Sequence, residues 1–475
     1  MKLKQLALIV GLLSSATAFA APVTVAEIDA ARSNGSLQQA WITGATAPTL
    51  SVYEGWVGSG AGVGCDVNTN SIFTTQTGTA SRPGSLGNVF AYACRRAGVV
   101  SVLYSTISGG SLSAYTPHTI GALPERIRFV GTGNGCSSTV NYVDGTNTEN
   151  NATVFKGCLQ VAGTAVATVN DGAPTKPAGG FSDVEAALFP ATIGGGNVTS
   201  FGAESQALVG QVFGVVVSTP LYRALQAAQG LSDVNGTTYD PANAPNITSA
   251  QYASIITQGG AYQTDWSPIV GAAGVGKKVI LARRVATSGS QASSNAFFLK
   301  NPCASGVNAG YNPAGVADTT PTFEVTEGSG TGNVKTRLST ASTAGDFAIG
   351  VVSLENDWRA DLVSAPASAG YRFVKVDSVH PETGDVANAR VTAATGAYPF
   401  HMELVNFVAS SATGFAAAII PEITAALAQP APASCATLPR GITLNPLGGS
   451  SCAVGVQVAK GTNLGNNCSP AQLTQ

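Results

Sequence analysis

The chain has 475 residues, with 24 basic and 26 acidic side chains, a formal net charge of −2 at pH 7, and a charged fraction of only 11%. A nucleic-acid-binding surface needs clustered Lys and Arg, and here the basic residues form no cluster longer than a pair. This argues against a nucleic-acid partner. On a prior of roughly 150 residues per domain, the length suggests two or three domains.

Residues 1–20 have the pattern of a secretory signal peptide. Residues 1–4 carry two lysines, residues 6–13 are apolar, and Ala18 and Ala20 supply the small side chains of a cleavage site. The apolar run is too short to span a bilayer, and no later stretch approaches about 20 uninterrupted apolar residues. We therefore expect cleavage near Ala20 and a mature protein that is periplasmic or secreted, with no membrane insertion.

The chain contains eight cysteines, which are located at positions 65, 94, 136, 158, 303, 435, 452 and 468. An even number in an exported chain predicts disulfide bonds. Proximity in sequence favours the pairs 65–94, 136–158 and 452–468, which leaves 303 and 435, although sequence alone does not fix the connectivity. No Cys-x-x-Cys motif occurs, so a structural zinc or a thioredoxin-like redox site is not indicated.

Strand-like and helix-like segments alternate along the chain. The predicted strands are residues 40–43, 99–104, 213–218, 279–281, 347–354, 371–376 and 402–408. The predicted helices are one that begins at Pro48, one after Glu185, 222–229, 247–256 with an N-cap, one after the 288–290 turn, one from Gly332, and 413–428. Residues 57–98 are interpreted as a glycine-rich excursion stapled by a disulfide, and residues 429–475 as a Pro-punctuated, Cys-rich tail. The alternation predicts an α/β architecture with largely parallel sheets, which bind ligands beyond the carboxyl ends of their strands.

The turn that follows Arg283 and Arg284 has the chemistry of an anion site. A predicted strand leads into the arginines, and Ser288-Gly289-Ser290 then opens a helical segment. Backbone N–H groups at such a turn point at an anion, and an adjacent Arg adds a planar charged fork. Similar Ser, Thr or Gly turns occur at residues 44–48, 105–111 and 179–185. All four turns fit one shared cleft.

The order of these motifs resembles that of the phosphate-binding proteins of phosphate ABC transporters, within the type II periplasmic binding proteins. The segments that carry the resemblance are 42–48, 104–110, 181–183, 247–256 with Trp266, 283–290, 332–333, 348–351 and 398–400, which together span roughly residues 40–410. The resemblance implies a two-domain α/β fold with a hinge and central mixed sheets, to which this chain adds disulfide-stapled insertions. Domain 1 would comprise residues 38–212 and a return segment at 371–428, and domain 2 residues 213–370.

The resemblance also implies roles for individual residues. Thr46 and Ala47 would lie in the first ligand loop, and Ser108, with Ser111 as the alternative, in the second. Asp183 would accept a proton from the bound oxyanion, and Arg284 would pair with the ligand. Ser288, Gly289 and Ser290 would donate N–H and O–H groups.

Two positions depart from the family pattern. Ala286 stands where an acidic residue is expected two positions after Arg284, and Ala47 stands where an aromatic residue is expected after Thr46. The missing acceptor weakens the argument for phosphate over sulfate. Plainer interpretations also remain: Arg284 in an ordinary ion pair, Asp183 as the cap of the next helix, residues 288–290 as a simple turn, and Thr46 and Ser108 as structural residues.

Other motifs do not support a different chemistry. Residues 271–278 resemble a phosphate-binding P-loop, but Lys278 stands where Ser or Thr is required. His118, His380 and His401 lack metal-ligand spacing, and no Gly-x-Ser-x-Gly nucleophile motif occurs. We expect no cofactor, no metal and no enzymatic activity.

The leading hypothesis is an exported solute-binding-like protein that recognises phosphate or a related oxyanion in an interdomain cleft, with an ABC permease as a partner. One alternative is a structural or adhesive extracellular protein that reuses the same fold, and another is an exported hydrolase. The ligand identity and the oligomeric state stay open at this stage.

Overall fold

The computed structural model describes residues 21–58, 64–74, 87–128, 143–147, 152–156, 172–231, 241–257, 265–361, 370–382, 391–394, 397–428, 442–444, 460–462, 465–469 and 472–474. The predicted signal peptide and the cysteines at 136, 158, 435 and 452 lie outside these ranges. The expected Cys136–Cys158 pair therefore stays a prediction.

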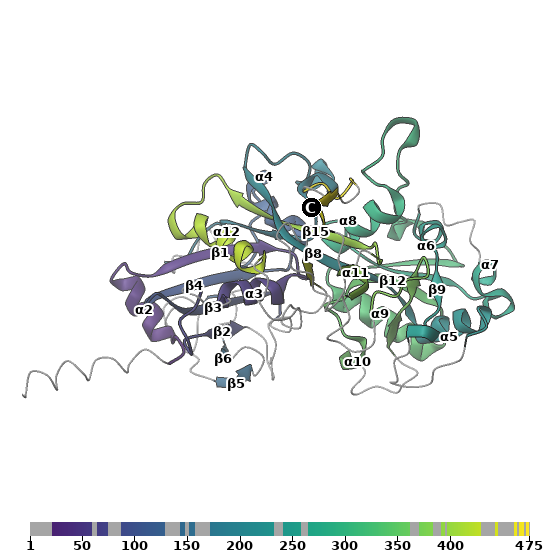
Figure 1. Cartoon of the computed structure of the whole chain (residues 1–475), viewed down its shortest axis with the longest axis horizontal. Coiled ribbons are helices and arrows are strands. Elements are labelled where there is room, and N and C mark those ends of the chain that lie inside the picture. Colours follow the sequence, from purple (N-terminus) through teal and green to yellow (C-terminus); the bar gives the residue numbers. More distant parts are fainter. Residues whose placement is uncertain are drawn as a thin grey trace, which may run out of the picture.

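One mixed sheet of 14 strands runs through the molecule (Figure 1). Its order is β11-β10-β12-β8-β15-β7-β1-β4-β3-β2-β6-β5, and β13 and β16 also pair with β8. Strand β8 (Gly202–Ser218) is 17 residues long. Its first part, up to Val212, pairs with β15, and its last part, from Phe213, pairs with β12 and β13. We call the β15 side of this division the first lobe and the β12 side the second lobe.

In the described ranges, the first lobe contains the strands at the β5 end of the sheet and four α-helices. Its strands are β1 (Gln38–Gly44), β2 (Ser71–Thr74), β3 (Val89–Arg96), β4 (Val99–Thr106), β5 (Val143–Asn147), β6 (Ala152–Lys156), β7 (Gly179–Ser182), β15 (His401–Ala409) and β16 (Ile442–Leu444). Its helices are α2 (Val25–Ser33), α3 (Thr49–Val57), α4 (Thr116–Thr119) and α12 (Gly414–Ala428).

The second lobe contains the strands at the β11 end. They are β10 (Val279–Arg284), β11 (Phe323–Gly328), β12 (Ala348–Ser353) and β13 (Tyr371–Phe373), with a small parallel pair of β9 (Asn246–Ile247) and β14 (Lys375–Val376). Its helices are α5 (Thr219–Ala228), α6 (Ser249–Ile256), α7 (Ser267–Val270), α8 (Gly289–Ser294), α9 (Thr331–Ala344) and α10 (Trp358–Asp361). The short helix α11 (Val391–Ala394) and the hairpin of β17 (Lys460–Thr462) and β18 (Gln472–Thr474) complete the described elements.

Continuous apolar runs become strands that are covered on both faces. All six residues of β12 are buried, as are five of the six residues of β10, which is the pattern of parallel strands in the interior of a sheet. Helices α8 and α9 pack on these strands, and α3 and α12 pack together over the first lobe. The alternating pattern of the sequence therefore predicts the α/β class correctly.

Local capping agrees with the sequence at two helices. In α6, the Thr248 hydroxyl accepts from the Gln251 N–H, and the Gln251 side chain accepts from the Thr248 N–H. Thr24 and Glu27 make the same reciprocal arrangement at α2. Such capping boxes satisfy N–H groups that have no partner inside the helix. The N-cap predicted for the 247–256 segment is confirmed.

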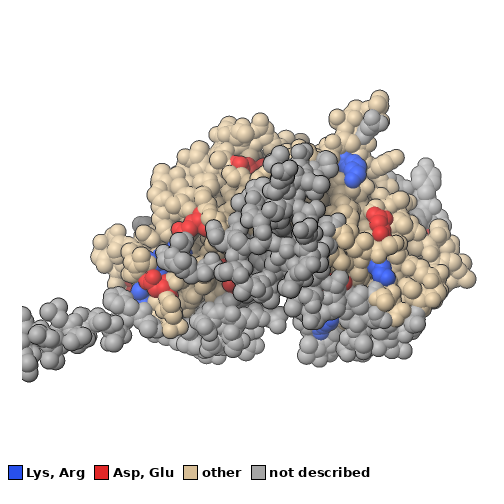
Figure 2. All heavy atoms as spheres, viewed as in Figure 1, with Lys and Arg blue, Asp and Glu red and all other residues tan. Residues whose placement is uncertain are grey.

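The largest apolar core extends across both lobes. It includes β8, β10 and β12 of the second lobe together with Tyr115, Val184 and Phe407 of the first lobe. Two smaller cores lie within the first lobe, around Trp56 and around Trp41. On the face shown in Figure 2, charged side chains of the described residues are scattered singly or in small groups, as expected from a charged fraction of 11%.

Several local predictions are wrong. The sheet is mixed, as the resemblance implies, and only the narrower inference of largely parallel sheets is wrong: β1, β4 and β7 are parallel, as are β10, β11 and β12, but β15 and β8 are antiparallel to their neighbours. Within the 57–98 segment, β2 and β3 are buried members of the sheet rather than an excursion. After Glu185 the chain forms only short 3-10 turns, because Pro190 lacks an N–H and Gly194 adopts a left-handed conformation.

The disulfides confirm one predicted pair and correct another. Cys65 and Cys94 are bonded, as predicted. Cys468, however, pairs with Cys303 across 165 residues rather than with Cys452. Sequence proximity is a poor guide here because the tail returns to the body of the molecule. Strands β13 and β14, which the domain prediction placed in the return segment, pair with β8 and β9; the domain division itself stays a prediction.

Across the residues that the structure describes, no helix combines the length and apolar character needed to cross a membrane.

A matched pair of glycines tests the packing of β7 on β1. A Cβ atom at Gly180 would lie 1.7 Å from the Thr43 carbonyl oxygen, whereas one at Gly332 in α9 would meet nothing within 4 Å. We expect Gly180→Ala to lower the free energy of unfolding by about 3 kcal/mol. Gly332→Ala should be neutral or stabilise by up to about 1 kcal/mol. Urea unfolding of both variants measures this, and equal effects would contradict the β1–β7 contact.

Candidate functional site

Loops from both lobes meet at the carboxyl ends of the parallel strands. The loop after β4 lies against the loop after β10, where the Leu112 N–H donates to the Thr287 carbonyl over 3.1 Å. Gly110 has a φ of +67°, and a Cβ there would lie 2.9 Å from the same carbonyl oxygen. The contact thus requires a residue without a side chain, and it brings the two lobes together directly.

Ser111, Asp183 and Gly289 form what we call the lobe junction. The Ser111 hydroxyl donates to Asp183 Oδ2 over 3.1 Å and accepts from the Gly289 N–H over 3.0 Å. It also accepts from the Asp183 N–H at 3.4 Å. Ser111 follows β4, Asp183 follows β7, and Gly289 begins α8 after β10. One hydroxyl therefore links three loops and both lobes.

The Asp183 carboxyl is the most constrained group of the junction. Asp183 is only 2% exposed, and among the residues that the structure describes its buried Oδ1 atom has no hydrogen-bond partner. Burial raises the pKa of Asp183 to about 6, while the Ser111 hydrogen bond and the charge of Arg284 act in the opposite direction. A buried carboxylate oxygen without a donor is unfavourable, and this cost agrees with the raised pKa.

Gly289 is fixed by the close approach of these groups. A Cβ there would lie 2.2 Å from Ser111 Oγ and 2.5 Å from Asp183 Oδ2. Any other residue would push the α8 backbone away from the carboxylate. The glycine that the sequence places between two serines is thus the point at which α8 contacts the first lobe.

Arg284 lies at the end of β10 and is 4% exposed. Its Nη1 donates to the Thr331 hydroxyl and its Nη2 to the Ser329 carbonyl, each over 2.8 Å, while its buried Nε has no partner in the described part of the chain. Burial lowers the pKa of the guanidinium, and the charge of Asp183 raises it again in part. Among the described residues Arg284 forms no direct ion pair, so its charge remains available to an anion.

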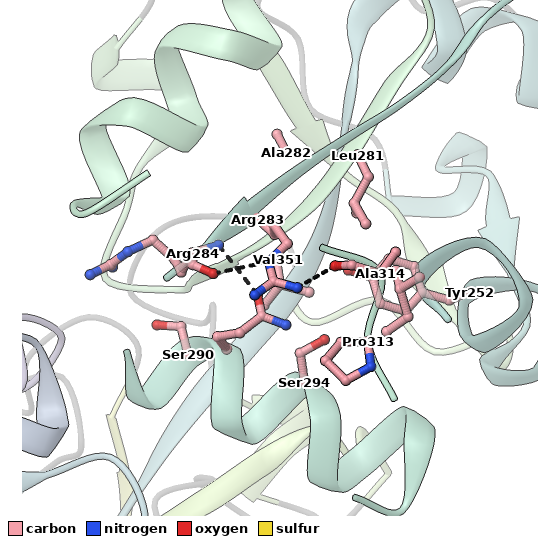
Figure 3. Close-up of a pocket in the computed structure, with 12 residues that line it drawn as sticks. Tyr252, Leu281, Ala282, Arg283, Arg284, Ser290, Ser294, Pro313, Ala314 and Val351 are labelled. Atoms are coloured by element: carbon pink, nitrogen blue, oxygen red, sulfur yellow. Dashed lines mark hydrogen bonds between the residues drawn. The ribbon is translucent and has the colours of Figure 1, made fainter. Parts of the chain in front are cut away.

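A pocket that Arg283 and Arg284 both line lies behind this turn. Figure 3 shows Arg283 directed into the pocket, where it donates to the carbonyls of Ala314 and Arg284. Its guanidinium also pairs with Glu327 over 2.8 Å. Arg284 points to another side of the same strand end (Figure 3). The two adjacent arginines therefore differ: Arg283 is neutralised within the second lobe, and Arg284 is not.

The remaining predicted residues are divided between the junction and its surroundings. Ser288 and Ser290 flank Gly289 and are buried, at 2% and 5% exposure. Ser108 is exposed, and Ser111, the alternative that the sequence offered, is the serine at the junction. Thr46 is half-buried; its carbonyl accepts from the N–H and hydroxyl of Thr49. Ala47 is buried near the start of α3.

The structure does not bear out two of the plainer interpretations. The turn that follows Asp183 has Glu185 at its N-cap position and no side-chain capping bond, so Asp183 does not serve as its cap. Arg284 donates to a hydroxyl and a carbonyl rather than to a carboxylate. Both charges are held inside the molecule by neutral partners.

Sequence reasoning missed Glu355, which follows β12 and is half-buried. Burial raises its pKa well above the usual value, and the charge of Asp183 raises it further. An acidic residue directly after a predicted buried strand was the signal that could have indicated it. A second carboxyl from the second lobe thus influences the same region.

Within the described ranges, no group of three or more His, Cys, Asp or Glu side chains is arranged to hold a metal ion. Among the described residues, Asp183 Oδ1 of the junction lacks a donor, and Arg284, whose charge acts on Asp183, lacks a carboxylate partner. These two groups suit a ligand that carries negative charge and also a hydrogen-bond donor.

No family model matches the chain, and no curated protein matches it in sequence. Among solved structures, it is similar to a phosphate ABC transporter substrate-binding protein with bound phosphate from Clostridium perfringens. The TM-score is 0.35 and the identity 10%, over 81% of this chain and 93% of that one. It is also similar to an ABC-type phosphate transport receptor from Vibrio cholerae, with a TM-score of 0.25 and 14% identity, over 48% of this chain and 66% of that one.

Two serines on the same loop test the hydrogen bonding of the junction. Ser111→Ala removes the shared partner of the Asp183 carboxylate and the Gly289 N–H, so we expect the free energy of unfolding to fall by about 2–3 kcal/mol. Ser108 is exposed, and Ser108→Ala should change stability by less than about 0.5 kcal/mol. Denaturant unfolding at neutral pH measures both, and equal values would show that Ser111 does not link the lobes.

The raised pKa of Asp183 predicts a pH-dependent stability. A carboxyl with a higher pKa in the folded state than in the unfolded state binds its proton more tightly when folded, so its contribution to stability grows as pH falls from 7 towards 4. The shift from 3.8 to about 6 corresponds to about 3 kcal/mol. We therefore expect Asp183→Asn to be more stable relative to wild type at pH 7 than at pH 4. A difference that does not vary with pH would contradict the burial of an ionisable Asp183.

Proposed function

We propose that this chain is an exported solute-binding protein that holds a small, partly protonated oxyanion, such as hydrogen phosphate, at the lobe junction. The observation that carries the proposal is the buried, unpaired Oδ1 atom of Asp183 at a point where loops of both lobes converge. A hydroxyl of the ligand would donate to this oxygen. The partly unpaired guanidinium of Arg284 would supply the positive charge.

This chemistry separates phosphate from sulfate. Hydrogen phosphate carries a proton that a carboxylate accepts, whereas sulfate carries none at neutral pH and would face the Asp183 charge without compensation. Ala286 supplies no second acceptor, so in this proposal the discrimination depends on Asp183. The ligand class is thus an oxyanion with at least one O–H group.

Ligand entry requires the lobes to separate where they touch. In the closed arrangement, the Gly289 N–H is bonded to Ser111 and the Leu112 N–H to Thr287. A ligand that contacts both lobes would favour the closed state, as in hinge-closing binding proteins. The Ser111 hydroxyl would then turn towards the ligand, which is possible because a hydroxyl can both donate and accept a hydrogen bond.

The compartment and the partner follow from the same proposal. The Cys65–Cys94 and Cys303–Cys468 bonds support a location in the periplasm or outside the cell, where disulfides persist. The exported chain would pass its ligand to an ABC permease. In this role it binds without catalysis and needs no cofactor.

A structural or adhesive extracellular protein is the second candidate. Two observations favour it. The Gly289 N–H and the Ser111 hydroxyl are already hydrogen-bonded to each other, and the apolar core continues across both lobes. Both features hold the molecule closed without a ligand. In that case Asp183 would be a buried carboxyl retained for the specificity of lobe packing.

Calorimetry of the mature chain, residues 21–475, distinguishes the two candidates. At pH 7.5 we expect micromolar or tighter binding of phosphate, no binding of sulfate, and loss of phosphate binding in Arg284→Ala. Asp183→Asn should weaken phosphate binding by at least about tenfold and permit sulfate binding. Asp29→Asn, which alters an i,i+3 ion pair on α2, is the matched control and should bind like wild type.

The absence of heat with phosphate, sulfate and a panel of small organic acids, on protein with an intact fold, would reject the solute-binding proposal in favour of the structural candidate. Binding that survives Arg284→Ala and Asp183→Asn would place the ligand elsewhere.

A further inference from the structure

A short C-terminal segment, residues 465–469, lies against both lobes. It follows a stretch outside the described ranges and returns to the middle of the molecule, near the position marked C in Figure 1. At Gly465, a Cβ atom would lie 3.3 Å from the Gln206 side chain of β8. The tail thus reaches the strand that the two lobes share.

Asn467 attaches this segment to the first lobe. Its N–H and its Nδ2 donate to the two carboxylate oxygens of Glu185, over 2.8 and 2.7 Å. Its Nδ2 also donates to the Glu403 carbonyl over 3.1 Å, and its Oδ1 accepts from the Glu403 N–H over 2.8 Å. The Gly465 N–H adds a longer bond of 3.3 Å to the Glu403 side chain. Hydrogen bonds to a carboxylate are among the stronger ones.

The attachment is buried rather than superficial. Glu185 is 4% exposed, Glu403 1% and Asn467 9%. Burial raises the pKa of Glu185, and the hydrogen bonds from Asn467 lower it in part. Because Glu185 lies two residues after Asp183, the tail holds the same loop that forms the lobe junction.

The next residue attaches the segment to the second lobe. Cys468 is bonded to Cys303, with a Cα–Cα distance of 5.1 Å. Cys303 follows α8 and the π-helical turn that continues it to Leu299, and α8 begins at Gly289 of the junction. Adjacent residues of the tail are therefore fixed to different lobes, one by a hydrogen-bonded network and the other by a covalent bond.

We propose that residues 465–469 form a strap that holds the two lobes closed at the junction. Consecutive Cα atoms are separated by about 3.8 Å, so the lobes cannot move apart at this point by more than a few ångströms unless Asn467 leaves Glu185 and Glu403 or the disulfide is lost. The proposal concerns the mobility of the lobes and goes beyond ligand binding. In a solute-binding protein, Asn467 would have to leave Glu185 and Glu403 before the lobes separate for ligand entry, whereas in a structural protein the strap would keep them closed.

The strap predicts how the junction amides behave in hydrogen exchange. The Leu112 and Gly289 N–H groups are bonded across the lobes, so their exchange reports separation of the lobes. The Asn467 hydrogen bonds and the Cys303–Cys468 bond are linked by the chain, so each holds the other attachment at a high effective concentration. Losing one of them removes this advantage from the other. In the ligand-free chain, we expect Cys303→Ser/Cys468→Ser to accelerate exchange of both amides by at least about tenfold. Asn467→Ala should have an effect in the same direction.

The second disulfide provides a matched control. Cys65 and Cys94 both lie in the first lobe, so Cys65→Ser/Cys94→Ser should leave exchange at Leu112 and Gly289 unchanged. Amides of β4 in the strap variants show whether the fold as a whole is intact, and they should retain wild-type exchange. If the double variant does not fold, Asn467→Ala decides the question.

Unchanged exchange at both junction amides in the folded strap variants would overturn the proposal. So would an equal acceleration in the Cys65→Ser/Cys94→Ser control or throughout β4, because the effect would then be a general loosening. These measurements use no ligand, so a failure to bind phosphate would leave the test of the strap intact.

Discussion

The buried carboxyl of Asp183 is the constraint on which the lobe junction depends. A charge at 2% exposure needs donors, and among the described residues Asp183 has the Ser111 hydroxyl as a hydrogen-bond donor and the charge of Arg284 as a favourable neighbour. To reach Ser111, the α8 backbone must come so close that only glycine fits at position 289. The burial of Asp183, the contact between the lobes and the glycine at position 289 therefore depend on one another, and in the proposal Oδ1 is the acceptor for a ligand.

The shared strand β8 explains how loops so far apart in sequence can meet. It pairs with β15 along its first part and with β12 along its last part, so the two sets of parallel strands belong to one sheet. The carboxyl ends of β4, β7 and β10 then bring three turns to one place. The Cys303–Cys468 bond and the Asn467 contacts lie on either side of the same division. The shared strand β8, the tail contacts and the lobe junction therefore all bear on one motion, the separation of the two lobes.

Much of this arrangement is predictable from the sequence, because it depends on local patterns. The apolar runs at 213–218 and 347–354 predicted strands, the Thr248 pattern predicted a capped helix, and the turns at Asp183 and Gly289 drew attention to residues that do meet. What could not be predicted depends on distant contacts. The choice of Ser111 over Ser108, the pairing of Cys468 with Cys303, and the burial of Glu355 follow from how separate loops pack, and no local spacing determines them. The 3-10 turns after Glu185 show the reverse case, in which Pro190 was a local signal that outweighed helix-forming Ala and Leu.

A crystal structure of the mature protein grown with phosphate at neutral pH tests the central claim most directly. The account predicts tetrahedral density between the lobes, within hydrogen-bond distance of Asp183 Oδ1 and near the guanidinium of Arg284, with the Ser111 hydroxyl turned towards the ligand. A well-ordered junction that retains the Ser111–Asp183 and Ser111–Gly289 bonds, with no phosphate beside Asp183, would contradict it.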